Sequence, residues 1–163
     1  MLKLVIGDHN YSSWSLRPWL VLKQSGLPFE EVSIRLRESR TKAEILKHSP
    51  SGKVPCLIDG ETVVWDSLAI CEYANERWLG GRGWPADLAQ RAVARAAAAE
   101  MHSGFTALRT EMVMNVRASA PGRGATPDAL ADVARILGVT RQTVYRYFPS
   151  TGELLAATAM DAV

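Results

Sequence analysis

The pattern of apolar and polar positions predicts alternating strands and helices at the start of the chain. Residues 2–6 form a short apolar run that ends at a glycine, which is typical of a buried strand, and residues 15–25 carry apolar side chains at helical spacing. Residues 29–36 alternate between polar and apolar side chains like a second strand, and residues 41–48 suit a short helix that ends before Pro50. The chain therefore opens as strand, helix, strand, helix.

A hairpin and a third helix are expected next. Two short runs, 54–58 and 61–65, flank Asp59-Gly60, a dipeptide that strongly favours a tight hairpin turn. A helix over 66–78 follows. This order of elements builds a sheet of four strands with parallel and antiparallel neighbours, covered by helices. The predicted fold class is α/β, and its layout resembles the thioredoxin fold.

The rest of the chain is predicted to be helical. After a turn-rich linker over 79–85, residues 87–116 form an alanine-rich stretch that favours one long helix. Residues 118–125 are a second linker of small residues, where we place a domain boundary. Beyond it, residues 126–137 begin with a capping Thr-Pro pair and end before Gly138, and two more short helices follow. We expect a small all-α, helix-turn-helix-like tail.

Composition and charge narrow the class of protein. The chain of 163 residues is 47% hydrophobic and 22% charged, which is typical of a globular protein and excludes disorder. It lacks an apolar run long enough to span a membrane, and we expect a cytoplasmic protein without a membrane partner. The net charge is +2, and residues 119–163 carry four basic and four acidic side chains, so charge alone indicates no nucleic-acid partner. Cys56, Cys71 and the three histidines show no metal-ligand spacing, so no metal site is expected.

Several hydroxyl groups lie where the first strand passes into the first helix. A helix N-terminus offers free N–H groups and a partial positive charge, so a hydroxyl there can hold a thiol as its thiolate and make it nucleophilic. The candidates are Ser12, Ser13 and Ser15. Capping of the helix explains a serine at this place equally well.

Two more segments could bind the same peptide-like ligand. Val54-Pro55 precedes the third strand, where a cis proline would leave the Val54 N–H and C=O free for a ligand backbone. Asp66-Ser67 opens the next helix, where Ser67 and the adjacent amides could bind a carboxylate and Asp66 an ammonium group. Each segment by itself is also an ordinary turn or cap.

These motifs together resemble the N-terminal domain of glutathione S-transferases, most of all the serine-type, zeta-like bacterial members. The resemblance covers about residues 2–117, with a glutathione-binding domain over 1–79 and the first helix of a truncated C-terminal domain over 87–117. It implies glutathione as co-substrate without a metal. Ser12 is the first choice for the hydroxyl that activates the thiol, followed by Ser13 and Ser15. The implied glutathione-binding residues are Lys53, Val54, Pro55, Asp66 and Ser67.

The resemblance leaves catalysis open. The expected reaction is transfer of glutathione to a small electrophile, because Trp14 stands where the zeta-like pattern has a cysteine. In this family a bundle of C-terminal helices lines the electrophile pocket and forms part of the dimer interface. Only the first helix of that bundle is matched here. A homodimer and an inactive truncated fusion therefore both stay open.

Residues 138–150 resemble the helix-turn-helix of TetR-type regulators, within a partial module over 126–163. The resemblance implies that Arg141, Gln142 and Thr143 reach base edges in the major groove and that Tyr145 and Tyr147 contact phosphates. A fragment of a DNA-binding regulator is thus an alternative function, and an amphipathic helix that merely packs is the simpler one. The helix that normally precedes the pair is expected to be absent, with the linker in its place, and the neutral charge predicts weak DNA binding.

Overall fold

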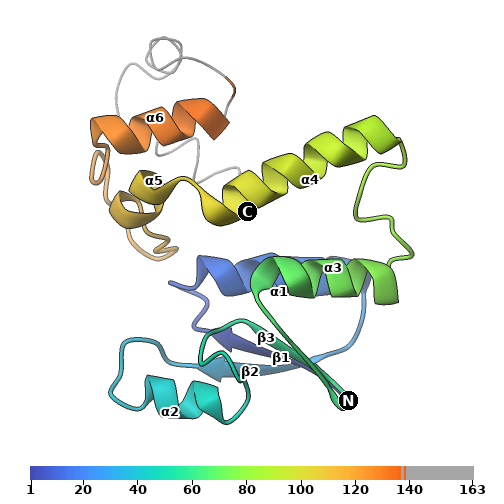
Figure 1. Cartoon of the computed structure of the whole chain (residues 1–163). Coiled ribbons are helices and arrows are strands. Elements are labelled where there is room, and N and C mark those ends of the chain that lie inside the picture. The colour runs from blue at the N-terminus through green and yellow to red at the C-terminus, as the bar shows by residue number, and fades with distance from the viewer. Residues whose placement is uncertain (137, 139–163) are drawn as a thin grey trace. The chain divides into compact units, whose positions relative to one another are not determined.

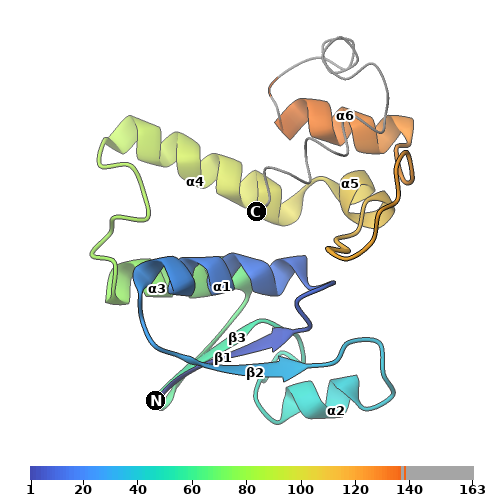
Figure 2. The ribbon, with the colours of Figure 1, turned by 180° about the vertical axis from the view of Figure 1, so that it is seen from behind.

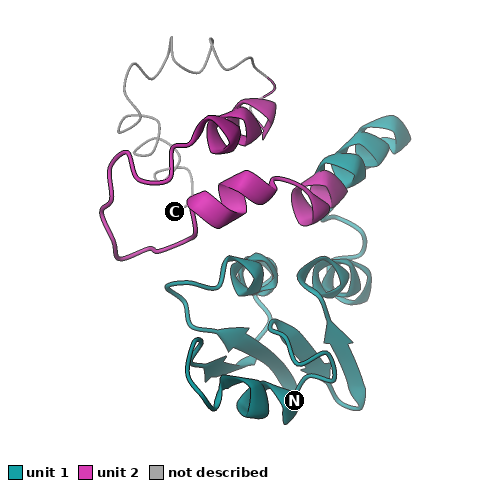
Figure 3. Ribbon diagram, turned by 60° about the vertical axis from the view of Figure 1, so that its left-hand side comes forward, with its two compact units in different colours: residues 1–97 teal, residues 98–163 magenta. Residues whose placement is uncertain are grey.

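The computed structural model describes residues 1–136 and 138. The chain divides into two compact units, of which the first is Met1–Ala97 and the second begins at Ala98 (Figure 3). The first unit contains the whole sheet and the three helices around it. Over its described residues, the second unit contains helices joined by loops and no strand.

The first unit contains a four-stranded sheet in the order β2-β1-β3-β4. The strands are β1 (Leu2–Gly7), β2 (Glu30–Ile34), β3 (Cys56–Asp59) and β4 (Thr62–Trp65). β1 and β2 are parallel, and β3 is antiparallel to both β1 and β4. The predicted mixed sheet and the hairpin at Asp59-Gly60 are confirmed, and Gly60 has the positive φ of 60° that such a turn needs.

Helices cover both faces of this sheet. α1 (Ser13–Ser25) and α3 (Ser67–Arg77) lie side by side on one face, and α2 (Thr41–Leu46) lies on the other (Figures 1 and 2). α1 ends at Gly26, whose left-handed conformation (φ 72°) makes it a regular C-terminal cap. The layout is the predicted thioredoxin-like one.

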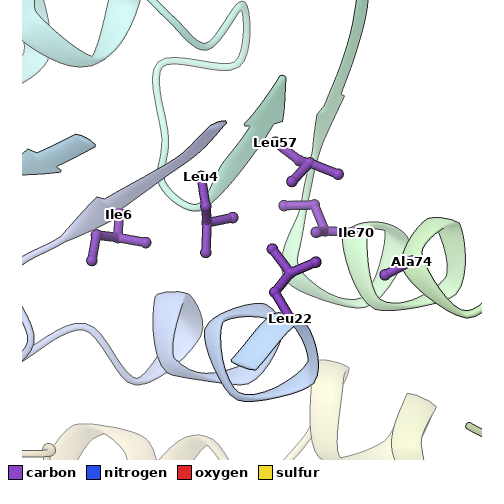
Figure 4. Packing of buried hydrophobic residues seen from close by; sticks show 6 residues of the cluster. All are labelled: Leu4, Ile6, Leu22, Leu57, Ile70 and Ala74. Carbon is purple, nitrogen blue, oxygen red and sulfur yellow. The ribbon is translucent and has the colours of Figure 1, made fainter. Parts of the chain in front are cut away.

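The alternation of side chains along β1 divides the core between the two faces. Leu4 and Ile6 point toward α1 and α3, where they pack with Leu22, Leu57, Ile70 and Ala74 (Figure 4). Val5, between them, joins the cluster on the face of α2 with Ile34, Ile45 and Cys56. The burial of these apolar side chains is the main stabilising contribution to the first unit.

The segment after α3 is tied back to that helix. The buried Asn75 side chain accepts a hydrogen bond from the Gly83 N–H at 2.7 Å, and Trp84 Nε1 donates to the Glu72 carboxylate at 3.0 Å. The predicted linker is therefore an ordered turn that leads into α4 (Leu88–Ser103).

The single long helix predicted over 87–116 was wrong, because the structure has two helices there. α4 ends at Ser103, and α5 (Thr106–Glu111) begins after Phe105, whose φ of 58° is left-handed. The Gly104 N–H donates to the Glu100 carbonyl at 2.7 Å, and the Gly104 carbonyl accepts from Arg109 Nε at 2.8 Å. Glycine lowers the helix propensity at this point, and these bonds stabilise the break.

The second unit continues through a loop to α6 (Pro127–Ile136). Thr126 caps this helix through a bond from the Ala129 N–H to its Oγ1 at 3.3 Å, as predicted, and Gly138 follows its end with a φ of 65°. Over residues 1–136 and 138, no helix is both long enough and apolar enough to cross a membrane.

Candidate functional site

Three chain segments meet at one edge of the sheet in the first unit. Cys56 at the start of β3 pairs with Val5 near the end of β1 and with Trp65 at the end of β4. β1 and β4 run in the same direction and each leads into a helix on the same face. The loop before α1, the Val54–Pro55 bond and the start of α3 at Ser67 therefore lie along a single edge, which we call the site edge.

Ser12 and Ser15 form a buried hydroxyl pair at the start of α1. Ser12 is the N-cap of the helix, and its Oγ accepts from the Ser15 N–H at 3.4 Å and donates to Ser15 Oγ at 2.8 Å. Ser15 Oγ in turn accepts the Gly7 N–H at 3.1 Å, and the Ser15 residue is only 3% exposed. This chain of bonds joins the end of β1 to the first turn of α1.

Gly7 is needed for that close approach. A Cβ at this position would lie 2.8 Å from Ser12 Cβ and 2.7 Å from Leu36 Cδ1, distances at which neighbouring atoms have to move. The absence of a side chain at the end of β1 therefore allows the Ser12 hydroxyl to sit against the strand.

The three serines are not equivalent. Ser15 anchors β1 to α1 and is closed to solvent, whereas Ser12 at 8% exposure borders the surface and Ser13 is exposed. The Ser13 hydroxyl makes no hydrogen bond to another described residue, while its N–H donates to the Tyr11 carbonyl at 3.1 Å. A ligand thiol can therefore reach Ser12 or Ser13 far more easily than Ser15.

The Val54–Pro55 bond is cis, as predicted. Val54 precedes β3, and its backbone makes no hydrogen bond to another described residue. The preceding loop is braced by a 2.9 Å bond between the hydroxyls of Ser49 and Ser51 and by donation from the Lys53 N–H to Ser51 Oγ at 3.2 Å. The Lys53 side chain is exposed at the site edge.

The start of α3 combines a strained residue with a buried hydroxyl. Asp66 has a φ of 77°, rare for a residue with a side chain, and its Oδ1 accepts from the N–H groups of Leu68 at 2.9 Å and Ala69 at 3.4 Å. Ser67 is 2% exposed, and its Oγ has no hydrogen-bond partner in the described part of the chain. Buried polar atoms nearly always have a partner, so this hydroxyl is a candidate to bind a group that residues 1–136 and 138 do not supply.

Two cation–π pairs flank the site edge, and sequence reasoning missed both. The Arg17 guanidinium lies 4.4 Å from the centre of the Trp14 ring, and that of Arg37 lies 5.3 Å from the Tyr11 ring. Arg37 adopts a left-handed φ of 64°, which directs the chain between β2 and α2 toward the loop before α1. Nothing in the sequence pattern signals that conformation in an arginine.

The two cysteines are free and shielded. Burial raises the pKa of the Cys71 thiol to about 11, and the nearby Arg17 charge offsets this only in part. Burial also raises the pKa of Cys56. Neither is a reactive thiolate at neutral pH. Within residues 1–136 and 138, no cluster of His, Cys, Asp and Glu could hold a metal ion.

The predicted DNA-contacting residues lie outside the described residues. They are Arg141, Gln142, Thr143, Tyr145 and Tyr147. Only the first helix of the predicted helix-turn-helix, α6, is described.

Comparison with known proteins agrees with the division into two parts. The family model "Glutathione S-transferase, N-terminal domain" matches residues 11–77, and the model "Helix-turn-helix domain of resolvase" matches residues 128–151. The second match supports a helix-turn-helix in the tail, but of the resolvase type and not specifically the TetR type.

Individual relatives point the same way. A zeta-class glutathione S-transferase of Euphorbia esula is 35% identical over 114 residues, which are 69% of this chain and 51% of that protein. A dichloromethane dehalogenase of Methylorubrum extorquens is 40% identical over 60 residues, covering 36% of this chain and 21% of that protein. A glutathione transferase homologue from Burkholderia, solved with bound glutathione, superposes with a TM-score of 0.56 and 28% identity over 67% of this chain and 57% of that one.

The first unit is thus a thioredoxin-like domain in which three segments meet at one edge of the sheet. It is similar to the N-terminal domain of glutathione S-transferases. The chain spans about half the length of the zeta-class relative.

Proposed function

We propose that the chain binds glutathione along the site edge. The observation that carries this proposal is the buried Ser67 hydroxyl without a partner at the N-terminus of α3. The α-carboxylate of the γ-glutamyl group would accept from Ser67 Oγ and benefit from the positive end of the helix dipole, while Asp66 faces the ammonium group. The similar structure of a glutathione transferase homologue from Burkholderia, which contains bound glutathione, supports the same ligand.

The other two segments would hold the rest of the tripeptide. Val54 offers its backbone N–H and C=O for pairing with the cysteinyl residue, as an added strand does at a sheet edge. Pro55 holds Val54 in its place, and Lys53 adds a positive charge beside a ligand that carries two carboxylates.

Ser12 is the hydroxyl we propose to activate the thiol. Its O–H now points to Ser15 Oγ, and a hydroxyl hydrogen rotates at little cost, so it can turn to a bound sulfur while Ser15 still accepts from Gly7. The N-terminus of α1 adds its partial positive charge, which lowers the pKa of a thiol bound there. The thiolate would then attack a small electrophile. Ser13 is the second candidate because it is exposed at the same helix end.

Calorimetric titration of reduced glutathione into the full chain tests the binding proposal. We expect millimolar or tighter binding, a loss of at least about tenfold in Ser67→Ala, and no loss in Ser33→Ala, an exposed serine on β2. Absence of heat with a folded protein would refute it and favour an inactive truncated fusion. If binding holds, assays with an aryl halide on Ser12→Ala and Ser13→Ala identify the activating hydroxyl by a loss of rate in one of them.

The cell compartment and the oligomeric state belong to the same proposal. Two free cysteines suit a reducing compartment such as the cytoplasm. We propose a homodimer by the resemblance to transferases, and sedimentation that shows only monomer at micromolar concentration would refute this.

Duplex DNA is the second candidate ligand, because residues 128–151 match a helix-turn-helix. By the TetR-like interpretation, Arg141, Gln142 and Thr143 would read bases, and Tyr145 and Tyr147 would contact phosphates. The four basic and four acidic side chains of residues 119–163 predict weak binding with a shallow salt dependence. Fluorescence anisotropy of a labelled random duplex at two salt concentrations tests this candidate, and no change at any concentration of protein would exclude it.

A further inference from the structure

Helices from both sides of the predicted 118–125 linker share one apolar core in the second unit. α6 is strongly amphipathic and lies beside α5 (Figure 1). Its buried members are Leu130, Val133 and Ala134, and they pack against Leu108, Met112 and Ala125.

A hydrogen bond and an ion pair join α6 to α5 and to α4. The Asp132 carboxylate accepts the Leu108 N–H at 3.0 Å, and this N–H lies in the first turn of α5, where the helix itself offers no partner. Arg135 in the last turn of α6 pairs with both oxygens of Glu100, at 3.0 and 3.1 Å. The second pair joins α6 to α4, is exposed and contributes little energy.

The loop between the two helices is packed against the end of α5. A Cβ at Gly124 would overlap with the Glu111 carbonyl oxygen, so no side chain fits there while the loop keeps its path. Gly122, two residues earlier, has a similar positive φ of 74° and no atom within 4 Å of such a Cβ. Of these two glycines, Gly124 is the one required by packing.

A helix-turn-helix needs a further helix to complete its core, because two short helices bury too little apolar surface to be stable alone. The sequence indicates no such helix directly before residue 126. We propose that α5 is this supporting helix, so that the helix-turn-helix module begins at α5 and not at the linker. This proposal rests on the second candidate function, and α5 lies outside both segments that match family models.

The proposal explains why the tail has no helix of its own in front of α6. Leu108 of α5 and Met112 at the C-terminal cap of that helix are covered by Leu130, Val133 and Ala134. Residues 106–112 therefore belong to the segment that resembles transferases, and they pack against the first helix of the helix-turn-helix.

Hydrogen exchange on the full chain tests this arrangement with a matched pair of variants. Gly124→Ala and Gly122→Ala share the strain of a positive φ, and only the first meets the Glu111 carbonyl. We expect amides of α6 to exchange about tenfold faster in Gly124→Ala than in Gly122→Ala, with residues 1–97 unchanged in both. Because a substitution in the loop can destabilise the second unit without acting through α5, Leu108→Ala is measured too.

Leu108→Ala shortens one side chain of α5 and leaves the loop unchanged. It should still raise the exchange rate of the α6 amides by a similar factor, since it removes a side chain that packs against Leu130 and Val133. Unchanged protection of α6 in Leu108→Ala and in Asp132→Ala would overturn the proposal, because α6 would then be held without α5. DNA binding of the unmodified chain is a separate readout. Its absence would remove the second candidate function, while coupled exchange of α5 and α6 would still establish the shared core.

Discussion

Replacement of Ser15 by alanine tests whether Ser15 has a structural role, in contrast to Ser12 and Ser13, the candidates for thiol activation. The change removes the acceptor of the Gly7 N–H at 3.1 Å and of the Ser12 O–H at 2.8 Å, in a position that is 3% exposed. A buried N–H left without a partner lowers the free energy of unfolding by about 1–3 kcal/mol. Since Ser12 can turn toward solvent, we count only the Gly7 N–H and expect a loss of about 2 kcal/mol.

Urea denaturation followed by tryptophan fluorescence measures this loss. Trp14, Trp19, Trp65, Trp78 and Trp84 are the five tryptophans of the chain, and all lie in the first unit, so the signal reports on that unit. With a slope of about 2 kcal/mol per molar urea, the midpoint should fall by about 1 M without a change of slope.

Ser13→Ala is the matched control, because Ser13 lies on the same helix turn, is exposed and has no side-chain partner among the described residues. Its midpoint should stay within the equivalent of about 0.5 kcal/mol of the parent chain. Equal midpoints for the two variants would refute the structural role of Ser15, and Ser15 would then return as a candidate for thiol activation.

Three further changes test other parts of the account. Ser67→Ala should weaken glutathione binding at least about tenfold without lowering the unfolding midpoint, since it removes a buried hydroxyl that has no partner among the described residues; a large fall of the midpoint would show that the hydroxyl has a structural role. Burial tends to raise the pKa of Glu31, but the neighbouring Trp19, Lys23 and His9 side chains outweigh it and lower that pKa, and Lys23 and His9 pair directly with the carboxylate. Its stabilising contribution is therefore present above the unfolded pKa and is lost as the pH falls through the folded one. The stability gap between the parent chain and Glu31→Gln should persist at pH 7 and close as the pH falls below the ordinary pKa of a glutamate; a gap independent of pH would contradict this. Because the pKa values of Cys56 and Cys71 are raised, the latter to about 11, iodoacetamide at pH 8 should label neither in the folded chain and both in urea, as mass spectrometry would show; rapid labelling of folded Cys71 would disprove its shielding.

The sheet of the first unit was predictable because local signals agree with the global fold. The apolar strands, the Asp59-Gly60 turn and the capping residue Ser12 each favour the conformation that the structure has. The three segments of the site edge followed from the same order of strands.

The break between α4 and α5 could not be predicted in the same way. The alanine-rich stretch has uniformly high helix propensity, and the signal of Gly104 alone is weak. Tertiary contacts favour the separate helix α5. Asp132, far along the chain, accepts a hydrogen bond from the first turn of α5, and apolar side chains of α6 pack against Leu108 of α5. Residues so distant in sequence leave no local pattern.

The different roles of the three serines were equally hidden. Ser12, Ser13 and Ser15 are the same residue type within one helical turn, and only the path of β1 decides which of them meets the Gly7 N–H. The left-handed Arg37 beside Tyr11 is also set by the loop as a whole and not by its sequence.

Titration of an isotope-labelled full chain with reduced glutathione, followed by amide NMR, tests the central claim most directly. The account predicts that the largest shifts occur at the amides of Val54, Ser67 and Leu68 and at the start of α1, and that Ser67→Ala removes them. Shifts confined to other surfaces, or no shifts at millimolar glutathione with a folded protein, would contradict a glutathione site at this edge of the sheet.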